Sequence, residues 1–121
     1  MIISAKAEKN GFDTVFCNET FKCAFITASR DYSFGAVNVM KKHNNTDEIF
    51  VLLCGRAVML TIENDEFKET VLKTERAYNV AKGTWHYLAV SEDAKVFVAE
   101  NADTNADTSE ELILSSEYVI K

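Results

Sequence analysis

Hydrophobic and polar residues form short runs along most of the chain, and turn-forming residues separate these runs. Val, Ile, Phe and Tyr dominate the runs, which is the composition and length typical of β-strands. The predicted strands are residues 21–28, 34–42, 48–54, 56–63, 67–73, 85–91 and 95–100. Short strands at even spacing in a chain of 121 residues predict an all-β sandwich or barrel.

The segments between and after these strands carry further signals. Gly55 lies between two strand runs and predicts a tight hairpin, and Asn64-Asp65 predicts another. Residues 103–109, Asp-Thr-Asn-Ala-Asp-Thr-Ser, predict a polar loop, whereas residues 110–121 fit either a short helix or an edge strand. No repeat or linker divides the chain, so we expect one domain over residues 1–121.

Composition and charge exclude several classes of function. Hydrophobic residues make up 47% of the chain and charged residues 26%, as in globular proteins. The net charge of −6 argues against a nucleic-acid or anionic-membrane partner, which would require a basic face. No apolar signal segment follows Met1, and no stretch approaches membrane-spanning length. The three cysteines form no Cys-x-x-Cys pair and leave an odd thiol, and with no signal segment we expect a cytoplasmic protein.

The stretch KKHNNTDEIFVLLCG, residues 41–55, contains candidate chemistry. By the two-residue period of a strand, four alternate residues share one face: Val37, Val39, Lys41 and His43. If the valines face the core, Lys41 and His43 face it too, at its far end. The turn over residues 44–47 resets the alternation and lets Glu48 lie across from His43. A histidine and a carboxylate placed in this way could hold a metal ion or form an acid–base pair.

The second histidine of the chain completes a pair of motifs. Four residues separate His43 from Glu48, six separate Glu48 from Gly55, and two separate Gly83 from His86. These spacings resemble the two motifs of the cupins, with motif one at about residues 41–55 and motif two at about 79–90. The resemblance covers roughly residues 21–100 and is to the small type-2-like cupins, whose functions are mostly unassigned. It implies a single-domain cupin double-stranded β-barrel, which is jelly-roll-like.

The resemblance also implies a metal site. By position, His43, Glu48 and His86 would hold a divalent metal such as Zn, Mn, Fe or Ni. The position of the family's first histidine holds Lys41, which has no lone pair when protonated and repels a metal ion. Glu48 could therefore pair with Lys41 in place of a metal. The usual motif-two proline is replaced by Ala81.

Alternation along the strands also gives candidates for the wall of a pocket. Phe50 shares a strand face with Glu48, and Leu88 shares one with His86, so both are pocket-lining candidates together with Lys41. The alternative for Phe50 and Leu88 is a purely structural role in the core.

Three functions remain open at this point. The first is a metal-dependent enzyme acting on a small metabolite. The second is a metal-free acid–base enzyme of the sugar or keto-compound isomerase type, with His43 or His86 as the base and Lys41 anchoring an anion. The third is a non-catalytic small-molecule binding module. The uninterrupted apolar run at residues 49–53 predicts a strand covered on both faces, and from it we expect a homodimer.

Overall fold

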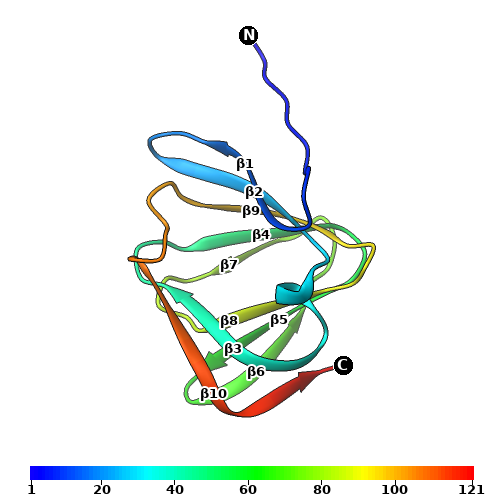
Figure 1. The fold of residues 1–121 in the computed structure, drawn as a ribbon, viewed down its shortest axis with the longest axis vertical. Coiled ribbons are helices and arrows are strands. Elements are labelled where there is room, and N and C mark those ends of the chain that lie inside the picture. Colours follow the sequence, from blue (N-terminus) through cyan, green and yellow to red (C-terminus); the bar gives the residue numbers. More distant parts are fainter.

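The computed structural model describes residues 1–121 and consists of two five-stranded antiparallel sheets (Figure 1). The first sheet has the order β1 (Gly11–Cys17), β2 (Phe21–Thr27), β9 (Lys95–Asn101), β4 (Glu48–Cys54) and β7 (Ala77–Val80). The second has the order β10 (Ser109–Ile120), β3 (Gly35–His43), β8 (His86–Val90), β5 (Ala57–Glu63) and β6 (Glu66–Val71). The predicted double-stranded β-barrel is therefore confirmed. The helical content is a single 3₁₀ turn, η1 (Arg30–Tyr32), and no helix could cross a membrane.

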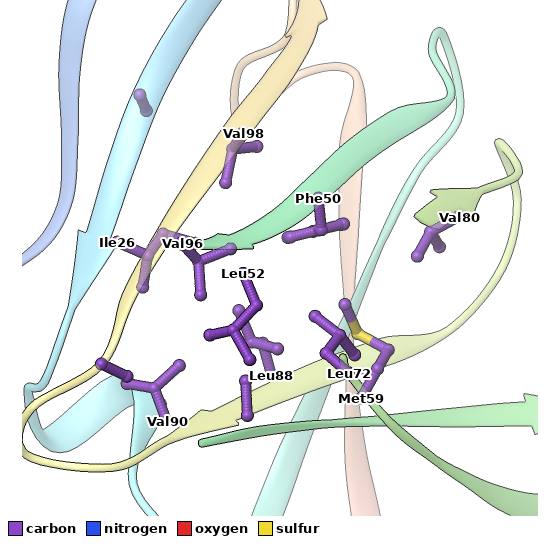
Figure 2. Close-up of a cluster of buried hydrophobic side chains, with 13 residues drawn as sticks. Ile26, Phe50, Leu52, Met59, Leu72, Val80, Leu88, Val90, Val96 and Val98 are labelled. Atoms are coloured by element: carbon purple, nitrogen blue, oxygen red, sulfur yellow. The ribbon is translucent and has the colours of Figure 1, made fainter. Parts of the chain in front are cut away.

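The main core lies between the two sheets, where alternate residues of each strand point inward (Figure 2). Phe50 and Leu52 of β4 and Val96 and Val98 of β9 face Leu88 and other side chains of the second sheet. Burying each of these large side chains stabilises the fold by roughly 1.5–3 kcal/mol. The inward alternation of β4 begins with Glu48, which places a carboxylate at one end of this core.

A second hydrophobic cluster covers the other face of the second sheet. It comprises Val37, Met40, Val58, Leu60, Ala89 and Ile120. The two edge strands of this sheet are joined there, because the Tyr118 hydroxyl of β10 donates a hydrogen bond to Glu69 of β6 at 2.6 Å. The centroid of the Tyr118 ring also lies 4.7 Å from the centroid of the Phe67 ring. The sheet is thus curled around a core of its own, which explains why β5 is buried on both faces.

The seven predicted strands are all present, with ends within two residues of the prediction. Residues 110–121 were predicted as either a short helix or an edge strand. They form most of the long strand β10, so the strand alternative is correct. Two strands were missed. β1 mixes polar residues into an edge strand, and β7 has four residues, which is too short for a clear period. The Asn64-Asp65 hairpin is confirmed, with both residues at positive φ in a two-residue connection between β5 and β6.

The predicted hairpin at Gly55 is wrong. β4 and β5 belong to different sheets and do not pair, so Gly55 connects the two sheets instead of turning one strand back on itself. Its φ is +79°, and a Cβ atom at this position would lie 2.5 Å from the Cα of Ala94. Glycine is required here because the crossing chain passes against the β8–β9 connection. A sequence pattern cannot distinguish this close approach from an ordinary turn.

The predicted face of β3 is also partly wrong. Val37 lies in the second cluster together with Met40, although the two residues are three positions apart. Val39, Lys41 and His43 instead line the cavity between the sheets. Strict alternation therefore fails within β3, and the pairing of β10 with β3 shifts register along the same stretch. The face assigned to Lys41 and His43 was right, but the argument from Val37 was not.

Candidate metal centre

Three side chains from three strand ends converge at one end of the barrel. His43 ends β3, Glu48 begins β4 and His86 begins β8. The His43 Nε2 atom lies 3.3 Å from Glu48 Oε1, and the His86 Nε2 atom lies 3.2 Å from the same oxygen. One potential ligand atom from each residue lies within 4.8 Å of the others. The Gly83 amide donates a hydrogen bond to the His43 carbonyl at 2.7 Å and holds the turn before His86 against the end of β3.

Hydrogen bonds on the far side of each ring orient the two imidazoles. His86 Nδ1 lies 2.9 Å from the Thr84 carbonyl oxygen, which can only accept, so Nδ1 carries the proton. In the neutral ring, Nε2 then presents its lone pair to Glu48. His43 Nδ1 lies 2.7 Å from the Ser109 hydroxyl at the start of β10. Partners of this kind fix the rings of metal-binding histidines in other proteins.

The electrostatics of this centre require a cation. An ionised carboxylate and a neutral imidazole nitrogen are both acceptors, so they repel each other unless a proton or a metal ion lies between them. Only the two imidazoles meet Glu48 Oε1, because no other donor bonds to it. Burial alone would raise the pKa of Glu48, but its contacts with His43 and His86 outweigh burial and lower it. The hydrogen bond to Glu48 in turn raises the pKa of His43, against the effect of burial.

Comparison with known proteins identifies the architecture. No protein-family model and no curated protein sequence matches the chain. A cupin-2 domain-containing protein from Shewanella frigidimarina superposes with a TM-score of 0.58 at 16% identity, over 75% of this chain and 79% of that one. The chain has the cupin fold. At 16% sequence identity, this similarity supports a shared fold and nothing about activity.

Two enzymes are among the other similar structures. Streptomyces Pac13, described as a nucleoside dehydratase, superposes with a TM-score of 0.63 at 6% identity, over 87% of this chain and 88% of that one. Bacillus subtilis oxalate decarboxylase, which has Mn(II) centres, superposes with a TM-score of 0.55 at 20% identity, over 79% of this chain and 24% of that one. The cupin barrel of this chain is therefore shared with metal-containing and other enzymes.

Lys41 lies beside the candidate metal centre and forms no ion pair with it. Lys41 is the cross-strand partner of His86, but its ammonium group is exposed and forms no ion pair with Glu48 or any other carboxylate. The alternative in which Lys41 neutralises Glu48 is therefore not the arrangement observed. Lys41 is exposed and leaves Glu48 to the histidines.

A cavity of about 1150 Å³ opens from the candidate centre to the surface of the barrel. Phe50, Leu88 and Lys41 all line it, as do the three converging residues. The Phe50 ring lies edge-on to His86 with 6.3 Å between ring centroids, so it shields one side of the imidazole from water. Tyr32 of η1 also lines the cavity, and burial and the charge of Glu48 raise the pKa of its hydroxyl.

The sequence interpretation missed Glu100, a second carboxyl group in this cavity. Glu100 ends the inward series Val96, Val98, Glu100 on β9 and is the cross-strand partner of Glu48. Its side chain is 7% exposed, and Oε2 has no hydrogen-bond partner. Burial, together with the charge of Glu48 and a hydrogen bond to it, raises the pKa of Glu100 to about 7. An acidic residue at an inward strand position was the signal that could have revealed it.

We expect Glu100→Gln to stabilise the metal-stripped protein at alkaline pH only. The pKa of Glu100 rises from 4.5 to about 7 on folding, so stability falls as pH increases through that interval, where the folded chain keeps a proton that the unfolded chain has lost. The substitution removes this penalty, which is at most about 3 kcal/mol. Thermal unfolding at about pH 4 and about pH 8 measures it. If the substitution shifts the melting temperature equally at both pH values, folding does not raise the pKa of Glu100.

Proposed function

We propose that this protein is a metal-dependent enzyme acting on a small metabolite, with the ion held by His43, Glu48 and His86. The observation that carries the proposal is the convergence of two imidazole Nε2 atoms and one carboxylate oxygen on a single buried point. Such a set of potential acceptors is stable around a proton or a metal ion, and a divalent ion can bind all three residues at once. Two imidazoles and one carboxylate suit Zn, Mn, Fe or Ni and leave coordination positions for a ligand. A bound divalent ion would supply Lewis-acid activation of an oxygen-containing group.

The residues around the ligand set would prepare this site for binding. Ser109 and the Thr84 carbonyl hold the rings so that both Nε2 atoms face inward. Phe50 and Leu88 provide an apolar wall that excludes water from one side of the cavity. Glu100 keeps a proton near neutral pH beside Glu48, and this proton could pass to a bound ligand. The dehydratase and decarboxylase with the same fold support enzymatic chemistry in such a barrel.

Metal titration tests this function directly. Metal-stripped protein is titrated calorimetrically with Zn²⁺, Mn²⁺ and Fe²⁺, and we expect one ion per chain for at least one of these metals. Binding should release protons below neutral pH, because the ion displaces the proton that His43 holds next to Glu48. No binding by any metal would contradict the proposal and favour a metal-free acid–base enzyme or a non-catalytic binding module.

We also propose a cytoplasmic homodimer. All three cysteines are free, which suits a reducing compartment. The outward face of the first sheet supports the dimer, because Phe25, Phe97 and Val51 are consecutive cross-strand neighbours that one chain leaves only half-buried. Leu53, which lies on β4 as Val51 does, is 48% exposed. Pairing with a second copy would cover these side chains.

For the dimer, we expect light scattering at micromolar protein to give about twice the chain mass of 13.6 kDa. Val51→Glu should shift the mass toward the monomer, because it places a charge within an apolar interface. A wild-type mass of 13.6 kDa would contradict the dimer.

A further inference from the structure

A second pocket opens beside the metal cavity. Its volume is about 630 Å³, and it lies between the residues that precede and begin β1 and the turn η1. Five residues line both spaces: Phe12, Arg30, Asp31, Tyr32 and Lys41. The side pocket therefore adjoins the cavity that contains His43, Glu48 and His86.

The side pocket is positively charged in an otherwise acidic chain. Lys9, Arg30 and Lys41 line it, and Asp31 is its single acidic residue, whereas the chain as a whole has a net charge of −6. None of the three cationic side chains forms an ion pair, since the lysine salt bridges of the chain are Lys42–Glu110 and Lys68–Glu63. None of them donates a side-chain hydrogen bond to the protein either; the Lys22 ammonium, in contrast, is bound to the Thr104 carbonyl. Three uncompensated cations are thus available to a ligand.

The position of Lys41 connects this charge to the candidate metal centre. Lys41 is the cross-strand partner of His86 and precedes His43 by two residues on the same strand. Its charge is close enough to lower the pKa of His43, against the stronger effect of Glu48. Tyr32 lies between the two spaces, with its ring against the core and its hydroxyl in the field of Glu48 and Glu100. One small molecule could therefore extend from the metal centre to the cations.

We infer that Arg30 and Lys41, assisted by Lys9, bind the anionic oxygen group of the ligand, a phosphate or a carboxylate, while its other end reaches the metal centre. Arginine offers a planar pair of N–H donors to such a group, and lysine adds a point charge. This gives a reason for a lysine at the motif-one position, because there it binds an anion and not a metal. The role as a substrate anchor rests on the proposed metal function, but anion binding by the side pocket does not.

Three probes with one carbon skeleton test the anion site: glycerol phosphate, glycerate and glycerol. We expect metal-stripped protein to bind the phosphate or the carboxylate probe and not glycerol, as measured by calorimetry or chemical-shift perturbation. The tighter of the two anionic probes identifies the class of anionic group. Arg30→Gln and Lys41→Gln should each weaken binding about tenfold, as expected for one charge-assisted hydrogen bond. Lys73→Gln is the matched control, since it removes the same charge from an exposed position outside both pockets.

The same titrations in His86→Ala separate the two proposals. This variant lacks a proposed metal ligand but keeps every cation of the side pocket, so we expect metal affinity to fall at least about a hundredfold and anion affinity to fall by less than in Arg30→Gln. Affinity that is unchanged in Arg30→Gln and Lys41→Gln would overturn the anion site, even if wild type binds metal. Anion binding without any metal binding would retain the anion site and contradict only the metal centre.

Discussion

We expect His86→Ala to lower metal affinity by at least about a hundredfold, because one of three protein ligands is lost. Loss of an outer hydrogen-bond partner alone typically costs 10–100-fold, and loss of a ligand costs more. Glu48→Gln should have an effect at least as large. It keeps the shape of the side chain but removes the charge that attracts the ion and places an amide between the two imidazoles.

The intermediate case is Ser109→Ala, which leaves all three ligands in place. This variant removes the hydrogen bond to His43 Nδ1, so the ring is free to rotate, and we expect an effect between that of His86→Ala and none. Glu63→Gln is the matched control for Glu48→Gln, because Glu63 is a carboxylate on β5 whose contacts are Thr61 and Lys68. Calorimetric titration of each variant gives the affinities, and circular dichroism checks the fold. Identical affinities in wild type and His86→Ala would show that His86 does not bind the metal and would contradict the proposed ligand set.

Lys41→His should increase metal affinity at least about tenfold. A unit charge about 5 Å from a divalent ion opposes binding by roughly 2 kcal/mol when water screens it fully and by roughly 7 kcal/mol at an effective dielectric near 20. The exposed position of Lys41 favours the lower figure. Histidine removes this charge and adds an imidazole on the strand face that lines the cavity, at the position where the resemblance places the first ligand of cupins.

Lys41→Gln distinguishes the two causes of this gain. Glutamine removes the charge without adding a nitrogen ligand, so its affinity should lie between those of wild type and Lys41→His. Equal affinities for the two variants would show that an imidazole at this position does not reach the ion. A wild type that binds metal more tightly than either variant would contradict the repulsion argument. Both substitutions should also weaken the anion site, which gives each variant a second and independent measurement.

Local pattern was sufficient for most strands and for the contact between His43 and Glu48, whereas pairing of β8 with β3 brings His86 to them. The strand runs carry their own two-residue period, and each motif places a polar side chain next to a strand end. The spacing from His43 to Glu48 sets a turn that brings the two residues together, and this contact is observed at 3.3 Å. Such features depend on a few neighbouring residues, so the sequence alone determines them.

The remaining features depend on contacts between residues far apart in the chain. Gly55 has the sequence signature of a hairpin, but the approach of Ala94 shows that the chain crosses between sheets there. β10 contains residues that suit a helix or a strand, and pairing with β3 decided for a strand. Glu100 is separated from Glu48 by more than fifty residues, and only the pairing of β9 with β4 makes them neighbours. The cationic side pocket likewise exists only because η1 folds over the start of β1, beside Lys41. The amino-acid sequence therefore determined the strands and the ligand types, whereas strand pairing decided which charges share one cavity.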